Sequence, residues 1–354
     1  MEIDRRTFLL KALAATGTTY AAVAVGCSSR SDRTSLRKAA EFLWAQQADD
    51  GGFHSTTYGL LRSGQSLTPF VIVALLGVPD SESSRPAGAI ERALEFISSN
   101  TNADGSLGLM DDTAADYPNY ATALAVSALV KIRRPGYERR IEPMVAQLRA
   151  QQLCEDNGWN PKDAPYGGWG MGGQIHRPPE AGHVDLSMTR YVLEALNASG
   201  VSPSDPAITR ALTFLQRSQN SNGGFYFSPV NPEINKGGPT GGGFASYGTA
   251  TADGVLALRV AGISDVDPRI ANALTWLKKH HQPDRAPGFD EASGEPWASG
   301  LRFYYAHAIS QVLPALPLEL PPQSPDGSYR NPVNLVKEDD PLIATAFALY
   351  AMAR

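Results

Sequence analysis

A short segment recurs along this 354-residue chain, and its spacing constrains the fold more than any other feature. In three copies an aromatic residue is followed by Leu or Ile, and a glycine stands nine positions after the aromatic. These copies are FLWAQQADDGGF (42–53), FISSNTNADGSLG (96–108) and FLQRSQNSNGGFYF (214–227). Looser copies end at Trp159 and Phe289. Repetition at this spacing indicates one structural unit that is stacked several times.

The residues before each glycine have the pattern of an amphipathic helix. Apolar residues recur at i, i+3, i+4 and i+7, which is one face of a helix. Asp205 and Asp267, each followed by proline, predict N-caps with proline at the first helical position. The five apolar sets begin at Leu36, Ile90, Ile141, Ile208 and Ile270.

A second series of segments alternates with the first and is apolar on all sides. Such helices are buried, so the alternation predicts an all-α toroid, in which about six hairpins place the buried series inside an outer ring. Residues 317–332 contain too many prolines for a helix, and we therefore expect the sixth outer helix to be missing. The expected inner segments are 66–78, 120–132, 185–200, 247–263, 301–316 and 340–353.

The N-terminal residues have the pattern of an export signal. Arg5 and Arg6 precede an apolar stretch, which resembles a twin-arginine signal, and the sequence AVGC ending at Cys27 resembles a lipobox. We expect residues 1–26 to be a signal peptide, 27–35 a linker and 36–354 the toroid. The protein would then be periplasmic or held in the cell envelope by a lipid on Cys27. An uncleaved anchor and a soluble exported protein remain alternatives.

The charge balance excludes one class of partner. The net charge is −5, and the Lys and Arg residues form no blocks. A chain of this kind lacks the basic patch that nucleic-acid binding requires, so we expect no nucleic-acid partner.

The repeated segment resembles the QW-type repeats of the prenyltransferase/squalene oxidase repeat superfamily. That superfamily includes triterpene cyclases and the β subunits of protein prenyltransferases. The resemblance covers residues 36–354 and implies an α/α toroid that handles an apolar, isoprenoid-type ligand. Within the superfamily, the chain is most similar to an exported bacterial branch. The glutamines that match the repeat are Gln47, Gln152 and Gln219, and the matching aromatics are Phe53, Trp159, Phe225 and Phe289.

The sequence departs from the chemistry that this resemblance implies. Triterpene cyclases protonate an alkene with an Asp-x-Asp-Asp motif, and the chain contains no such motif. The zinc site of the prenyltransferases needs a third ligand beside His183 and Asp185, which the sequence does not offer at a suitable spacing. We therefore expect neither a metal nor a cofactor.

Polar residues on or beside the inner segments are the candidate site residues. Asp253 and Asp185 are the candidate acids, because a buried carboxyl group has a raised pKa. For Asp185 the alternative is an N-cap, and for Asp253 it is a buried, hydrogen-bonded group. The candidate ligand-binding residues, for which ordinary core packing is the alternative, are Tyr120, His183, Tyr191, Tyr247, Tyr304, Tyr305 and His307.

Three functional hypotheses follow. The first is a terpene cyclase-like protein that binds or transforms an apolar isoprenoid with a non-standard acid. The second is a non-catalytic lipid-binding or scaffold toroid. The third is an exported polysaccharide lyase or hydrolase, which requires convergent Tyr, His and carboxylate groups in an open groove. Fold alone does not choose between them.

Overall fold

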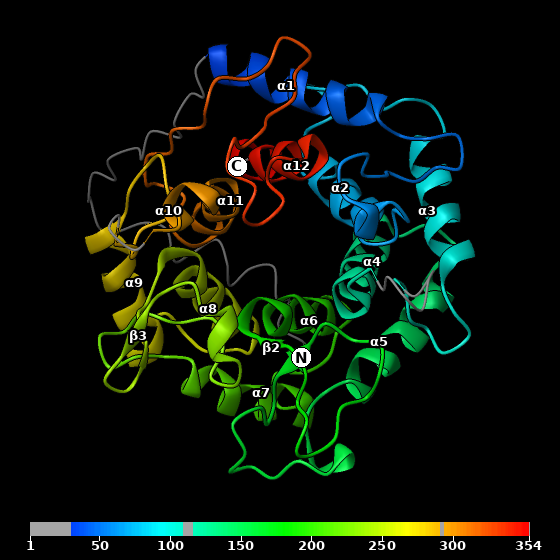
Figure 1. The fold of residues 1–354 in the computed structure, drawn as a ribbon. Coiled ribbons are helices and arrows are strands. Elements are labelled where there is room, and N and C mark those ends of the chain that lie inside the picture. Colours follow the sequence, from blue (N-terminus) through cyan, green and yellow to red (C-terminus); the bar gives the residue numbers. More distant parts are fainter. Residues whose placement is uncertain (1–29, 109–115, 291–293, 354) are drawn as a thin grey trace, which may run out of the picture.

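The computed structural model describes residues 30–108, 116–290 and 294–353, and its helices form two concentric rings (Figure 1). The inner ring consists of α2 (Leu67–Leu75), α4 (Pro118–Ile132), α6 (Leu186–Ala198), α8 (Gly248–Val260), α11 (Arg302–Val312) and α12 (Pro341–Met352). The outer ring consists of α1 (Arg30–Ala45), α3 (Ala89–Asn100), α5 (Ile141–Ala150), α7 (Pro206–Arg217) and α9 (Pro268–His280). The all-α toroid expected from the sequence is confirmed.

Short elements lie in the connections between these helices. Strand β1 pairs with β2 and strand β3 with β4, both antiparallel. The strands are β1 (Trp169–Gly170), β2 (Val184–Asp185), β3 (Pro239–Thr240) and β4 (Gly243–Phe244). The short helices are η1 (Gly59–Leu61), η2 (Glu138–Arg140), η3 (Glu155–Asn157), η4 (Pro232–Ile234) and α10 (Trp297–Gly300).

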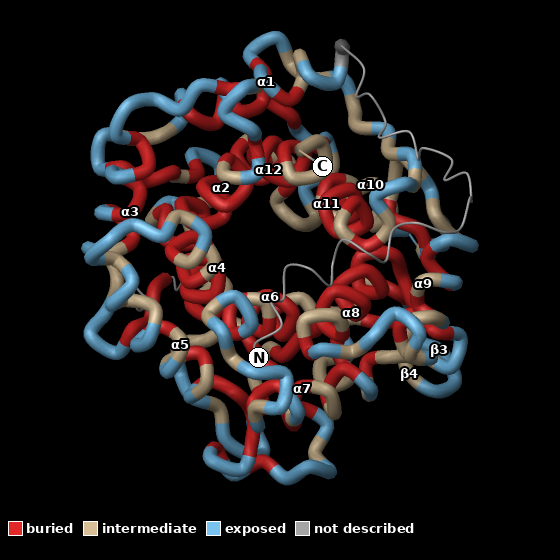
Figure 2. The backbone as a smooth tube through the Cα atoms, turned by 180° about the vertical axis from the view of Figure 1, so that it is seen from behind, coloured by how far each residue is buried: buried red, intermediate tan, exposed pale blue. Residues whose placement is uncertain are grey.

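Burial follows the two series that the sequence distinguishes. The inner helices are buried on nearly every side, whereas the outer helices expose the face turned away from the ring (Figure 2). The predicted caps of the outer helices are present: Asp205 accepts from the Ala207 N–H and Asp267 from the Arg269 N–H. No helix among the described residues is both long and apolar enough to span a bilayer.

Where the repeat has a glutamine, this residue and the glycine connect one outer helix to the next; the copy at 96–108 has Thr101 in place of the glutamine. Gln219 Nε2 donates to the carbonyl of Gly223 at 2.9 Å and to that of Arg269, in the first turn of α9, at 2.8 Å. Gly223 has φ +88°, and a Cβ there would lie 2.7 Å from the backbone of Asn272. Gln47 makes the same pair of bonds to Gly51 and Ala89. The repeated residues therefore form a structural joint between helices, and other residues must form any functional site.

The residue after each glycine pair is fixed to the next inner helix. The N–H of Phe53 donates to the hydroxyl of Thr68, and that of Phe225 to Thr251. In the looser copy that contains Gln152, the matching residue is Trp169, whose N–H donates to the Thr189 hydroxyl at 3.1 Å. Our assignment of Trp159 to this position is wrong, because residues 153–166 form an insertion between Gln152 and its partner Gly167.

The ring closes without a sixth outer helix. Residues 317–332 contain no helix, as expected, and α12 packs against α11, α2 and α1. The joint is nevertheless kept: Gln323 Nε2 donates to the carbonyls of Gly327 at 2.8 Å and Ser35, in α1, at 2.9 Å. This copy was not predicted, because no helical pattern precedes it in the sequence.

The structure describes only part of the region for which a signal peptide and a linker were predicted. Helix α1 begins at Arg30, inside the region expected to be a linker. Residues 1–26 and Cys27 lie outside the described residues, so the signal peptide and the lipid anchor stay predictions.

Candidate functional site

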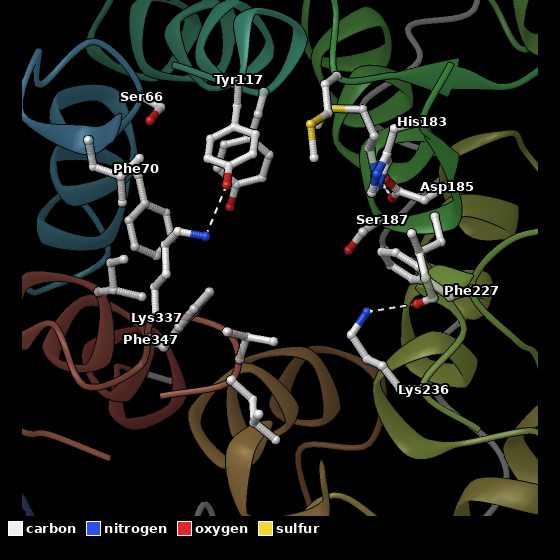
Figure 3. Close-up of a pocket in the computed structure, with 18 of the residues that line it drawn as sticks. Ser66, Phe70, Tyr117, His183, Asp185, Ser187, Phe227, Lys236, Lys337 and Phe347 are labelled. Carbon is white, nitrogen blue, oxygen red and sulfur yellow. Dashed lines mark hydrogen bonds and ion pairs between the residues drawn. The ribbon is translucent and has the colours of Figure 1, made fainter. Parts of the chain in front are cut away.

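One mouth of the toroid contains a cavity of about 490 Å³, which we call the mouth cavity (Figure 3). It is formed where the first turns of four inner helices meet the loops that precede them. Its wall is mainly apolar, with Phe70 from α2, Met188 from α6 and Phe347 from α12 among the contributors. A volume of this size is typical of sites that enclose a small organic molecule.

Two lysines reach into the mouth cavity from opposite sides (Figure 3). Lys337 Nζ donates to the hydroxyl of Tyr117 at 3.0 Å. Lys236 Nζ lies 3.8 Å from the centre of the Phe227 ring and donates to the Ile234 carbonyl at 3.3 Å. Burial lowers the pKa of Lys236 from 10.5 to about 8, although the carboxylates of Asp185 and Asp253 oppose this effect.

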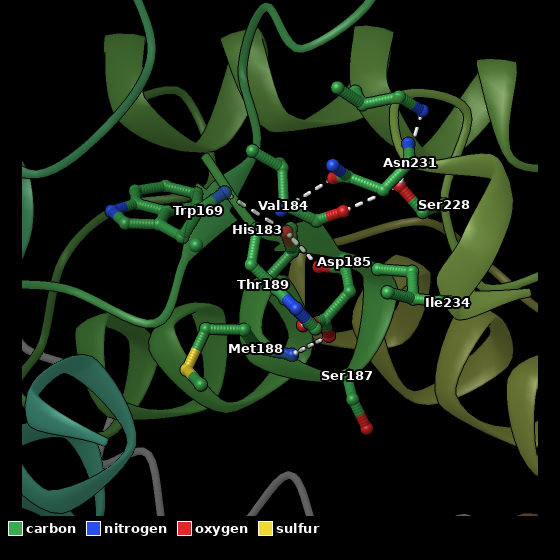
Figure 4. A network of polar contacts seen from close by, with 12 residues as sticks. Trp169, His183, Val184, Asp185, Ser187, Met188, Thr189, Ser228, Asn231 and Ile234 are labelled. Atoms are coloured by element: carbon green, nitrogen blue, oxygen red, sulfur yellow. Dashed lines mark hydrogen bonds and ion pairs between the residues drawn. The ribbon is translucent and has the colours of Figure 1, made fainter. Parts of the chain in front are cut away.

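A histidine–aspartate pair lies on the same rim (Figure 4). His183 Nε2 is 2.9 Å from Asp185 Oδ2, and Asp185 Oδ1 accepts from the Met188 N–H at 2.8 Å. Asp185 is thus the N-cap of α6, which was the structural alternative for this residue. It also lines the mouth cavity, so capping and ligand contact are compatible.

The loop that presents Lys236 is fastened to strand β2 (Figure 4). Asn231 Oδ1 accepts from the Val184 N–H at 3.0 Å, and Ser228 Oγ donates to the Val184 carbonyl at 2.6 Å. Asn235, next to Lys236, accepts from the N–H groups of Phe227 and Ser228. These bonds hold the Lys236 backbone in one place relative to the inner ring.

Beneath the mouth cavity lies a cluster of paired polar groups, which we call the floor cluster: Ser187, Arg190, Asp253 and Tyr304. Arg190 NH1 is 2.9 Å from Asp253 Oδ1, and both side chains are 1% exposed. Ser187 and Tyr304 donate to Asp253 Oδ2 at 2.8 and 2.7 Å. Burial raises the pKa of Asp253, whereas Arg190 and these hydroxyl groups oppose the rise.

A second space of about 180 Å³, which we call the side chamber, adjoins the mouth cavity. The two share several lining residues, including Lys236 and Val336. Glu338 lines the side chamber and accepts from the N–H groups of Phe303 and Tyr304, at the start of α11, at 3.0 and 2.8 Å. Burial raises the pKa of Glu338 to about 7, against the effect of these donors.

The structure brings some of the predicted ligand-binding residues together and separates others. Tyr120, His183 and Asp185 line the mouth cavity, and Tyr247 and Tyr304 line the side chamber. The remaining predicted residues line neither space; they are Tyr191, Asp253, Tyr305 and His307.

Each of these four residues has another environment. Asp253 lies in the floor cluster, and Tyr191 packs against the Tyr120 ring with 4.6 Å between ring centres. The hydroxyl of Tyr305 is 2.9 Å from His281 Nδ1, just after outer helix α9, so this side chain points away from the lumen. His307 packs between Phe347 and Tyr350.

Lys236, Lys337 and Glu338 were not predicted from the sequence. All three lie in irregular loops, outside the apolar segments in which a charged residue stands out. A weak signal exists for Glu338, because it stands in the acidic run Glu338-Asp339-Asp340 just before an apolar helix, where carboxylates commonly cap.

Solved structures of several proteins share this fold. The type II terpene cyclase MstE from Scytonema is 15% identical, with a TM-score of 0.56 and coverage of 91% of this chain and 98% of that one. A protein from Actinoplanes is 16% identical, with a TM-score of 0.51 and coverage of 91% and 98%. The structure described as UGL with dGlcA-Glc-Rha-Glc is 13% identical, with a TM-score of 0.51 and coverage of 84% and 79%.

Sequence comparison identifies the family. No curated protein sequence matches the chain significantly. The sequence pattern of the A-macroglobulin TED domain matches residues 6–229, which is more than half of the chain. This chain, with the α/α toroid that its repeats imply, therefore belongs to the A-macroglobulin TED domain family.

Proposed function

We propose that this protein binds an apolar, isoprenoid-type small molecule in the mouth cavity. The observation that carries the proposal is a partly open cavity of about 490 Å³ whose wall includes Phe70, Met188, Ile343 and Phe347. Exclusion of water by such a wall favours the burial of a hydrocarbon chain by about 25 cal/mol per Å² of apolar surface. Apolar groups make up most of the lining surface of this cavity.

Proteins with the same fold support a ligand of this kind. MstE has been solved in complex with its substrate geranylgeranyl dihydroxybenzoate and with its product merosterolic acid A. Those molecules belong to that enzyme, and at 14–16% identity the likeness shows the fold alone and does not specify a ligand for this chain.

The arrangement favours binding over acid-initiated cyclisation at Asp253. That carboxyl group lines neither space and is paired with Arg190. Of the carboxyl groups that line the two spaces, Glu338 is the one whose pKa is raised toward neutrality. Glu338 therefore replaces Asp253 as the candidate proton donor in a protein that transforms its ligand.

The experiment is mass spectrometry of small molecules extracted from the purified protein. Wild type is compared with Val336→Trp, because Val336 lines both spaces and a larger side chain there reduces their volume. We expect an apolar compound from wild type, and a strongly reduced yield from the variant. Equal yields from both proteins, or failure of wild type to bind added farnesol in solution, would contradict the proposal.

A second function is favoured by the groups on the rim. Tyr117 with Lys337, and His183 with Asp185, face the same cavity, so Tyr, His and carboxylate groups converge as a polysaccharide lyase requires. Cleavage of a glucuronate-containing oligosaccharide, followed by the absorbance of the new double bond, tests this alternative. The mainly apolar wall between the two pairs ranks it below the first proposal.

We also propose that the protein is exported by the twin-arginine-type signal at residues 1–26 and anchored by a lipid on Cys27. The support is the paired Arg5 and Arg6 and the AVGC sequence. Metabolic labelling with a fatty-acid analogue tests the anchor, with Cys27→Ser as the control. Labelling of wild type alone is expected, and equal labelling of both proteins would refute the assignment.

A further inference from the structure

The side chamber is smaller than the mouth cavity and lies between the first turns of α8 and α11. Most of its lining surface is apolar, so the few polar groups that reach it stand out. The polar side chains in its lining are Ser187, Lys236, Tyr247, Thr249, Tyr304 and Glu338. Since the chamber opens beside the mouth cavity, one molecule can place its chain in the larger space and its polar end in the smaller.

Lys236 lacks a counterion in this chamber. Within the part of the chain that the structure describes, no carboxylate oxygen lies within 4 Å of its Nζ. Its single hydrogen bond, to the Ile234 carbonyl, is long at 3.3 Å. The aromatic ring of Phe227 stabilises the cation but does not neutralise it.

Helix α8 begins in the chamber without a side-chain cap. Tyr247 stands at its N-cap position and makes no capping bond. By contrast, carboxylates cap three other inner helices: Asp185 caps α6, Asp340 caps α12 and Glu338 bonds the first turn of α11. The start of a helix carries a partial positive charge and N–H groups that need acceptors, so α8 lacks the anion that these three helices have.

The hydroxyl of Tyr247 independently indicates a missing group. Tyr247 is 1% exposed and lines the chamber, yet its hydroxyl has no hydrogen-bond partner among the described residues. A buried polar group without a partner destabilises the folded state, so native proteins rarely keep one without a use. A ligand that accepts a hydrogen bond there would satisfy it.

The acidic groups near the chamber are already occupied. Glu338 accepts from two backbone N–H groups and from Asn331 Nδ2 at 2.8 Å. Asp253 is held by Arg190, Ser187 and Tyr304. The unmet capacity of the chamber thus consists of donors and positive charge: Lys236, the Tyr247 hydroxyl and the start of α8.

From these contacts we infer that the side chamber binds the carboxylate of an apolar acid whose hydrocarbon chain fills the mouth cavity. The inference rests on the proposed function and names its ligand class. A carboxylate fits better than a phosphate monoester, because the latter carries a charge near −2 and would lie close to Asp185 and Asp253. One ammonium group and one helix start suit a single negative charge.

The test is calorimetric titration with farnesoic acid and methyl farnesoate, which share one carbon skeleton but differ in charge. Wild type should bind the acid at least tenfold more tightly than the ester, as expected for hydrogen bonds to a charged group. Lys236→Met should bring the two affinities close together, and Lys236→Arg should restore most of the preference. Tyr247→Phe should weaken the acid severalfold and leave the ester unchanged.

Lys278→Met is the matched control, because Lys278 is an exposed lysine on outer helix α9 and its loss removes the same charge from the chain. The control should keep the wild-type preference. Equal affinities of wild type for acid and ester would overturn this inference and leave the proposed function standing. Binding of neither compound would overturn both. A preference lost equally in Lys278→Met would reduce the effect to net charge and would also overturn the inference.

Discussion

The floor cluster and the side chamber are neighbours, but the charged groups of the floor cluster are paired with one another, whereas the lysine of the side chamber has no ion-pair partner among the described residues. In the floor cluster the guanidinium of Arg190 faces Asp253 and Glu194, at 2.9 and 2.8 Å. In the side chamber Lys236 has no such partner among the described residues, and Tyr247 has a hydroxyl without a bond. The comparison teaches that burial alone does not mark a binding group. The state of its partners decides whether it is structural or available.

The largest expected effect comes from breaking the floor cluster. Arg190→Met leaves Asp253 buried without its cation, and removal of one partner of a buried pair costs about 3–5 kcal/mol. Denaturant unfolding at neutral pH should show this loss in the free energy of unfolding. A second variant that also replaces Asp253 with Asn should recover part of it. A loss below about 1 kcal/mol would show that the pair is not the enclosed unit described above.

The next effect is a pH dependence that originates at Glu338. Burial raises its pKa from 4.5 to about 7, so its contribution to stability is complete below pH 4.5 and is lost as the pH rises through 7. A shift of this size corresponds to roughly 3 kcal/mol. The difference in unfolding free energy between wild type and Glu338→Gln should therefore fall over this range. A difference that does not change with pH would mean that Glu338 titrates normally.

Replacement of Lys236 should have the opposite sign to replacement of Arg190. Because the pKa of Lys236 is lowered in the folded protein, its ammonium group reduces the free energy of unfolding below pH 8. This destabilisation disappears as the pH rises toward 10.5. Because the side chain is partly exposed, we expect Lys236→Met to stabilise the ligand-free protein by about 1–2 kcal/mol at pH 7. Thermal unfolding of wild type and Lys236→Met at pH 7 and pH 10 measures this difference in stability. Destabilisation at pH 7 would reveal a partner that the structure does not show.

The smallest effect distinguishes two buried tyrosines. Tyr247→Phe should raise the unfolding free energy of the ligand-free protein by about 1 kcal/mol, because it removes a buried hydroxyl that makes no bond among the described residues. Tyr304→Phe removes a donor to Asp253 at 2.7 Å and should cost about 1.5–3 kcal/mol. Equal losses for the two variants would contradict the distinction between floor cluster and side chamber.

The ring could be predicted from the sequence because periodicity and repetition report burial directly. The five outer helices, the six inner helices and the caps at Asp205 and Asp267 follow from local patterns. The sixth joint escaped prediction, because Gln323 and Gly327 are recognisable only when their bonds to each other and to α1 are seen. Trp159 was misplaced because an insertion imitates the repeat.

The site could be predicted only where it lies on the inner helices or directly before them. Asp185, Tyr120 and Tyr304 were found because polar or aromatic residues stand out on apolar segments. Asp253 was also found, but its pairing with Arg190 across two helices leaves no trace in either segment. Lys236 and Lys337 lie in loops of ordinary composition. Their convergence on one cavity results from ring closure, which no local pattern encodes.

The most direct measurement is the pKa of the Lys236 amine. It is obtained by an NMR pH titration of protein whose lysine amines have been modified with ¹³C-labelled methyl groups. The variant Lys236→Arg assigns the signal. The structure predicts a value of about 8 in the ligand-free protein, well below an ordinary lysine, and an increase when farnesoic acid binds. A value near 10.5 that does not change on addition of the acid would contradict the claim that this chamber holds an unpaired cation for a ligand.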